Sequence, residues 1–174
     1  MTRLVALVGG IFFSAMCFAQ SMQQELSAFE PFVGHTYRGQ FSPDKEGNVA
    51  EDISRWERIL GGRAIRISHS LNRGDYAGES LIFWDAKVQS IAFFYVTNAG
   101  FQTRGTGHFE DGIFVTREEV SGNLQGITEV VARSTLHEDG SMTVSSYYLK
   151  GDEKISGSTA HYVRDNDAVL VFND

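Results

Sequence analysis

Apolar and polar residues alternate through most of the chain beyond residue 34, with the two-residue period of β-strands. After residue 50, for example, Ile53 and Arg55 fall on one face of an extended segment. Trp56 falls on the opposite face. The alternation predicts strands at residues 35–41, 51–60, 63–71, 77–85, 90–97, 101–110, 112–120, 127–137, 142–150, 155–164 and 168–172.

Short segments rich in Gly, Asn and Asp separate the predicted strands, as at residues 98–100, 110–112 and 138–140. Links this short favour antiparallel neighbours. Before the first strand, residues 22–32 combine good helix formers with apolar positions at Leu26, Phe29 and Phe32, and Gly34 follows. This pattern predicts one short helix at the start of the domain.

About ten strands joined by hairpins, without crossover helices, predict an all-β fold. An open up-and-down sheet of this kind would expose two edges, and closing it into a barrel removes them. We therefore expect an antiparallel up-and-down β-barrel of about ten strands. A β-sandwich is the alternative, but it needs longer Greek-key links, which the chain does not offer.

The first nineteen residues differ from the rest. Arg3 precedes an apolar run at residues 4–13, and smaller residues follow up to Ala19, which is the layout of a cleavable signal peptide. The run is too short to span a bilayer, so we expect no integral membrane segment after cleavage. We expect a signal peptide at 1–19, a single barrel domain at 20–174, and a periplasmic or secreted protein. Acylation at Cys17, as in a lipoprotein, is the alternative.

Cleavage after Ala19 would remove Cys17, the single cysteine, and thereby exclude disulfides and cysteine nucleophiles. The segment removed holds one base, Arg3, and no acid, so the formal charge would change from −7 to −8. Acidic charge repels phosphate backbones, and no basic stripe with interleaved aromatics is present, so nucleic acid is not an expected partner.

Polar residues on the inner face of a barrel are the candidates for ligand binding, because they would stand in an otherwise apolar wall. Either these side chains line a polar lumen that orients a small ligand, or they are outward, solvated side chains and mutually satisfied pairs. The candidates are Arg55, Trp56, His69, Tyr95, Arg104 and Glu129.

Motifs for catalysis or metal binding are weak. No two of the five histidines have the spacing of a recognised metal motif, so no metal site is predicted. The chain has no Gly-x-Ser-x-Gly motif, and Ser68 and His69 would point to opposite faces. The pair Glu118–Glu119 also falls on opposite faces and is interpreted as solvated charge. Whether the protein is an enzyme stays open, with binding favoured.

Several short motifs resemble lipocalin-like barrels of the calycin group. They are the stretch Phe32-Val33-Gly34-His35-Thr36-Tyr37-Arg38-Gly39, the Arg55-Trp56-Glu57 strand, the turn Leu60-Gly61-Gly62-Arg63 and the segment 79–85. The likeness is closest to bacterial lipocalin-like domains of unknown function and more distant to nitrobindins, ten-stranded barrels that bind haem. It implies His161, in a late strand, as a haem ligand, although Tyr37 stands near the place of the tryptophan typical of nitrobindins.

Three hypotheses follow. The first is an exported barrel that holds a small lipophilic or amphipathic ligand in its lumen. The second is a haem-binding barrel with His161 as the axial ligand. The third is an envelope interaction protein whose barrel is filled by its own side chains. The oligomeric state is not predicted.

Overall fold

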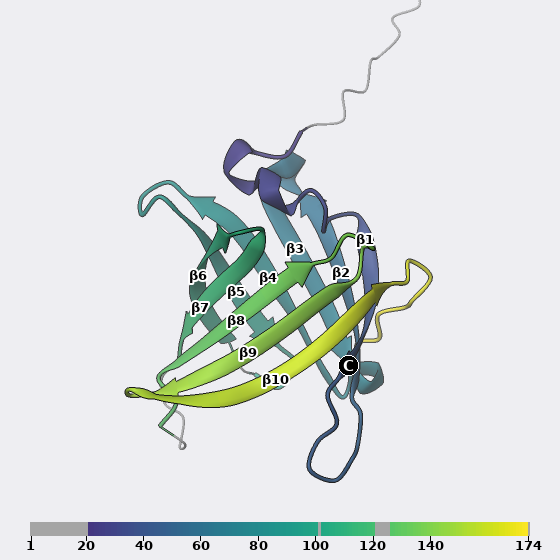
Figure 1. Ribbon diagram of the computed structural model, residues 1–174. Helices are drawn as coiled ribbons and strands as arrows, with labels where there is room; N and C mark the ends of the chain where they lie inside the picture. Colours follow the sequence, from purple (N-terminus) through teal and green to yellow (C-terminus); the bar gives the residue numbers. More distant parts are fainter. Residues whose placement is uncertain (1–20, 101, 121–125, 174) are drawn as a thin grey trace, which may run out of the picture.

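A computed structural model describes residues 21–100, 102–120 and 126–173, which form a closed antiparallel β-barrel of ten strands (Figure 1). Each strand pairs with its neighbours in sequence, and β1 also pairs with β10 to close the barrel. The strands are β1 (His35–Phe41), β2 (Glu51–Ile59), β3 (Ala64–Leu71), β4 (Tyr76–Asp85), β5 (Ser90–Thr97), β6 (Gln102–Glu110), β7 (Ile113–Glu119), β8 (Glu129–Leu136), β9 (Met142–Lys150) and β10 (Glu153–Arg164). This confirms the predicted fold class.

One end of the barrel is covered by the 3₁₀ helix η1 (Gln24–Phe29), which lies where a short helix was predicted. Two side chains of this helix, Leu26 and Phe29, are completely buried. The ring of Phe29 lies with its centroid 4.7 Å from that of Phe114 and 4.9 Å from that of Phe109, both edge-on. Phe32, which follows the helix, stacks on Trp56 at 5.2 Å. These aromatic contacts close this end with a packed apolar core.

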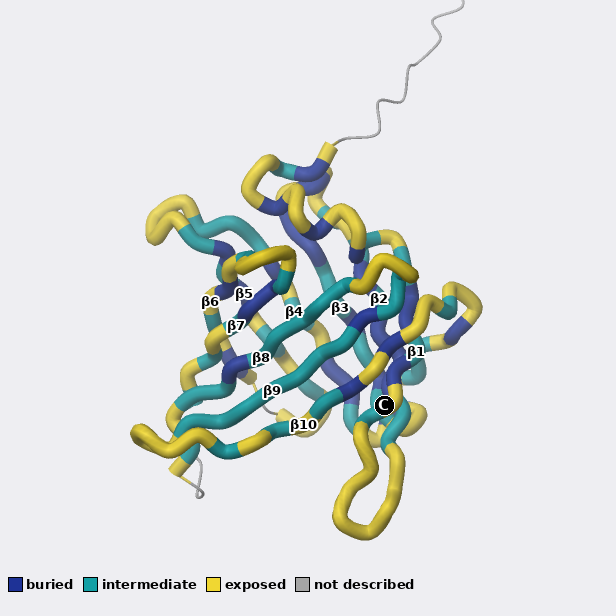
Figure 2. Tube along the Cα trace, in the orientation of Figure 1, coloured by how far each residue is buried: buried dark blue, intermediate teal, exposed yellow. Residues whose placement is uncertain are grey.

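Burial along the strands is uneven (Figure 2). Buried segments gather in η1 and in the strands beside it, whereas β9 is mostly of intermediate burial along its length. Two shorter 3₁₀ turns, η2 (Leu60–Gly62) and η3 (Asn72–Gly74), connect β2 to β3 and β3 to β4. A register shift between Ser156 and Thr159 bends β10 against β9. The solid core therefore occupies one end, and the opposite end is less tightly filled.

The predicted eleventh strand at residues 168–172 is not formed. The pairing of β1 with β10 uses the last free edge, so no strand edge is left for it. The segment instead lies on the outer surface, where Ser70 Oγ donates a hydrogen bond to the carbonyl oxygen of Val171 at 2.6 Å. Just before it, Asp165 pairs with Arg38 at 2.8 Å. These contacts fix the C-terminal segment against β1 and β3.

The expected signal peptide, its cleavage after Ala19 and Cys17 lie outside the described residues. Within the described part of the chain, no helix combines the length and apolar character that crossing a membrane requires.

Candidate functional site

The barrel encloses a cavity of about 480 Å³ that the described residues leave open at the end opposite η1. This volume lies within the range of roughly 300–1,000 Å³ typical of small-molecule sites. Its deep part is apolar and aromatic, with Trp56, Ile82, Phe93 and Phe114 in the wall. Polar side chains gather in the part nearer the opening. The cavity therefore combines an apolar floor with a polar upper wall.

Alternation along β2 and β3 places three polar residues in this lumen. Asp52 and Ser54 share the inward face of β2 with Trp56, and His69 shares the inward face of β3 with Ile67. Asp52 is almost fully buried, with 3% of its side chain exposed, and its Oδ1 lies 3.0 Å from Nδ1 of His69. A buried carboxylate needs such partners, because burying it unpaired would be costly.

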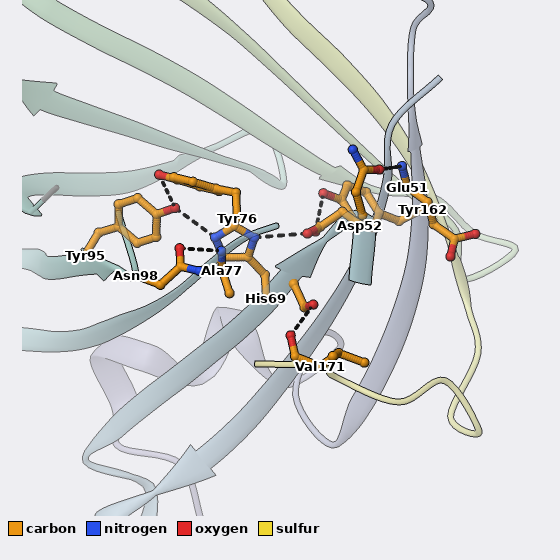
Figure 3. A network of polar contacts seen from close by, with 11 residues as sticks. Glu51, Asp52, His69, Tyr76, Ala77, Tyr95, Asn98, Tyr162 and Val171 are labelled. Atoms are coloured by element: carbon orange, nitrogen blue, oxygen red, sulfur yellow. Dashed lines mark hydrogen bonds and ion pairs between the residues drawn. The ribbon is translucent and has the colours of Figure 1, made fainter. Parts of the chain in front are cut away.

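The network extends around the wall from His69 (Figure 3). Nε2 of His69 lies 2.8 Å from the hydroxyl of Tyr95 on β5. The Tyr95 hydroxyl donates to that of Tyr76 on β4 at 3.0 Å. On the other side, the Tyr162 hydroxyl on β10 donates to Oδ2 of Asp52 at 3.0 Å. Five side chains from five strands thus form one continuous chain of polar contacts.

Gly78 makes this arrangement possible. It pairs with His69 across β3 and β4, so a side chain there would enter the lumen between His69 and Tyr95. A Cβ atom at Gly78 would lie 2.7 Å from the Tyr95 ring and 3.1 Å from Nε2 of His69. Without that atom, the imidazole and the phenol stack with their centroids 5.7 Å apart.

Burial governs the acid–base character of the lumen tyrosines. Burial chiefly, together with the hydrogen bond to Tyr76, raises the pKa of Tyr95 above the ordinary value of 10.0. Burial, reinforced by the charge of Asp52, raises the pKa of Tyr162 well above the same value. Both hydroxyls therefore stay protonated near neutral pH. The Asp52–His69–Tyr95 order is that of an acid–base–nucleophile relay, but a phenol held protonated suits hydrogen bonding better than nucleophilic attack.

Glu118 is a lumen residue, although its sequence pattern predicted a solvated charge. It lies on the inward face of β7 and lines the cavity, while its neighbour Glu119 is exposed. Burial raises the pKa of Glu118 above its ordinary 4.5. The hydroxyl of Thr103 offsets part of this rise, although that hydroxyl is itself buried without a well-formed hydrogen bond.

Three of the six predicted ligand-binding residues, namely Trp56, His69 and Tyr95, line the lumen together. The other three lie on the outer surface. Arg55 Nε donates to Thr36 Oγ1 at 3.3 Å. Arg104 stands 4.6 Å above the ring of the exposed Phe94, and Glu129 pairs with Arg117 at 2.6 Å.

Arg104 and Glu129 also line a wider depression of about 660 Å³. Its wall also includes Val120 and Thr128, in the connection between β7 and β8. The lumen, in contrast, is lined by side chains from nine of the ten strands. We therefore take the lumen as the candidate site.

His161 points away from the lumen. It is exposed on the outer face of β10, between the lumen-facing positions Ala160 and Tyr162, and its Nδ1 lies 3.1 Å from Thr143 Oγ1. The histidine that does line the lumen, His69, has both ring nitrogens engaged by Asp52 and Tyr95. Neither imidazole is placed to ligate a haem iron in the cavity, so the histidine ligation that the resemblance implies does not fit this lumen.

Among the described residues, no group of three or more His, Cys, Asp and Glu side chains is arranged to hold a metal ion.

One further polar group beside the cavity lacks a partner: Nε1 of the buried Trp56 makes no hydrogen bond within the described structure. A buried donor in this state commonly bonds to an ordered water or a ligand.

Asp52 and Tyr162 were not predicted. Asp52 stands at the start of a strand beside the loop, where an acid usually signals solvent. The available signal was its spacing, because residues 52, 54 and 56 must share one face and Trp56 belongs inside.

The comparison with protein-family models gives no match to this chain, and neither does the comparison with curated proteins. The closed ten-strand antiparallel barrel is consistent with a calycin-like or lipocalin-like fold.

Proposed function

We propose that this protein is an exported binding protein that holds a small, partly apolar ligand inside its barrel. The observation that carries the proposal is the cavity of about 480 Å³, closed at one end by η1 and lined by an apolar floor and an ordered polar network. Sites that bind small molecules typically combine an apolar wall with a few fixed polar groups.

The size of the cavity argues against the filled-barrel hypothesis. Small barrels packed solid by their own side chains leave little space in the lumen. Here small residues, namely Ser54, Ser80, Ala132, Ser134 and Ser158, take wall positions that larger side chains would need to occupy to fill it. The calycin-like architecture supports the same proposal, although one barrel type hosts many functions.

Native mass spectrometry of the protein purified from its own host tests this proposal. We expect a retained mass that is lost on denaturation. The variant Ser134→Trp fills the lumen and should release the ligand, whereas Ser145→Trp on the next strand faces outward and should retain it. If the protein carries no mass and no lipophilic or amphipathic compound raises its melting temperature, the proposal is wrong. Retention by Ser134→Trp would equally contradict the lumen as the site.

Export belongs to the same proposal, supported by the signal-like pattern of residues 1–19. Intact-mass measurement of the protein from the cell envelope or the medium should give a chain that begins at Gln20 and titrates no free thiol. A mass that includes Cys17 with an acyl group would replace this cleavage site with a lipoprotein one.

A further inference from the structure

The charges that line the lumen are unbalanced. Its described lining residues include two carboxyl side chains, Asp52 and Glu118, one histidine, His69, and no lysine or arginine. The remaining polar groups of the lining are hydroxyls and the indole N–H of Trp56, all of them uncharged. An anionic ligand would therefore enter a cavity whose described lining offers no lysine or arginine to pair with it.

Asp52 is already satisfied within the protein. One carboxylate oxygen lies 3.0 Å from His69, and the other accepts the hydrogen bond of Tyr162 at 3.0 Å. With both oxygens engaged and 3% of the side chain exposed, Asp52 organises the wall and has little capacity left for a ligand. The ligand must find its polar partner elsewhere.

Glu118 is the lumen carboxyl without a matching base. It makes no ion pair within the described chain, and the same burial that raises its pKa shows the cost of ionising it there. Glu118 and Tyr95 both line the cavity, and the charge of Glu118 contributes to the raised pKa of Tyr95. A cation placed beside Glu118 would supply the missing counter-charge, and the faces of Tyr95 and Tyr148 in the same wall also attract cations.

We propose that the lumen selects a cationic amphiphile, an amine with an apolar body, whose ammonium group pairs with Glu118 and whose apolar part lies against Phe93 and Phe114. This inference rests on the proposed function and specifies its ligand class. It differs from the general expectation for a lipophilic ligand because it predicts discrimination by charge among molecules of equal length and apolarity.

The test compares three ten-carbon probes, decylammonium, 1-decanol and decanoate, each below its micelle-forming concentration, by calorimetric titration at neutral pH. We expect decylammonium to bind about tenfold or more tightly than 1-decanol, as for close charge pairs at interfaces, and decanoate to bind most weakly. Glu118→Gln should bring decylammonium and 1-decanol to similar affinities. Glu119→Gln, the exposed neighbour, should leave the preference intact.

Charge reversal provides a second, independent variant. Glu118→Lys should invert the order, so that decanoate binds more tightly than decylammonium. Equal binding of decylammonium and 1-decanol by the unmodified protein would overturn this inference and leave the proposed function standing. No binding of any probe, together with no retained mass from the host, would overturn the proposed function itself.

Discussion

At the residue scale, the polar wall of the lumen is organised around a single buried carboxylate. Asp52 accepts from Tyr162 and contacts His69, and these contacts join β10 to β2 and β3. Tyr162 is 7% exposed, so its hydroxyl has little access to water if the carboxylate is removed. The network is therefore a structural element as well as a candidate binding surface.

Asp52→Ala should lower the free energy of unfolding by about 1–3 kcal/mol, because it leaves the buried Tyr162 hydroxyl and a ring nitrogen of His69 without partners. Urea unfolding at pH 7 measures the effect. Asp152→Ala, in the exposed β9–β10 turn, serves as the control and should change stability little. Equal stabilities of the two variants would show that the Asp52 contacts do not stabilise the fold.

The buried tyrosines predict a loss of stability at alkaline pH. The folded protein raises the pKa of Tyr95 and Tyr162 above the ordinary 10.0, so between that value and the folded pKa the unfolded chain has released protons that the folded chain retains. Stability is then fully present below pH 10 and falls as the pH rises further.

Urea midpoints measured between pH 8 and pH 11.5 test this expectation. The double variant Tyr95→Phe, Tyr162→Phe should show a shallower decline above pH 10, because it removes two of the groups responsible. A decline of the same slope in both proteins would assign the effect to other groups, such as Tyr37, whose pKa burial also raises.

At the element scale, η1 closes the barrel by inserting Phe29 among Trp56, Phe109 and Phe114. Phe29→Ala should reduce the free energy of unfolding by about 3–5 kcal/mol, because it leaves a cavity in a fully buried aromatic cluster. Chemical denaturation measures the loss. Glu30→Ala, one residue further and exposed, is the matched control. A small effect of Phe29→Ala would indicate that the barrel is stable without its helical cover.

The ten strands were predictable because each has the alternation of a wall with one apolar face and one solvated face. Observed boundaries lie close to the predicted ones, and β1, β5 and β9 match them completely. Closure was predictable from the edge argument. A closed barrel has no free strand edge, and for this reason the predicted strand at 168–172 does not form.

The candidate site was harder to predict because alternation identifies two faces without saying which is inside. On β2, each face carries an arginine beside apolar residues, and Arg55 was chosen together with Trp56 although adjacent residues must face opposite ways. The inward face carries Asp52, Ser54 and Trp56. Glu118 was missed for a related reason, since an acid in a strand usually marks the solvated face.

At the scale of the whole molecule, closure depends on the pairing of β1 with β10, whose residues are more than 100 positions apart in the chain. The register places Gly39 opposite Tyr162, and a Cβ atom at Gly39 would overlap the Tyr162 ring. Because Gly39 has no side chain, the Tyr162 ring can lie against the β1–β10 pairing and its hydroxyl can still reach Asp52.

Gly39→Ala should destabilise the protein by about 1–3 kcal/mol, because the added methyl group displaces the Tyr162 ring from a packed position. It should also weaken ligand binding, since Tyr162 lines the lumen. Thermal unfolding and the titration with decylammonium measure both effects. Gln40→Ala, next along the same strand and exposed, is the control. Unchanged stability in Gly39→Ala would mean that the seam accommodates a side chain.

Because η1 covers one end of the barrel, the lumen is a pocket with a closed end and not a channel. In the part of the chain that the structure describes, the buried Leu26 and Phe29 of η1 close one end, so a ligand enters and leaves through the opposite end. An incoming ligand cannot displace a bound ligand from the closed end, so it binds only after the bound ligand has dissociated. Ligand exchange should then proceed at the dissociation rate of the bound ligand, whatever the concentration of the incoming ligand.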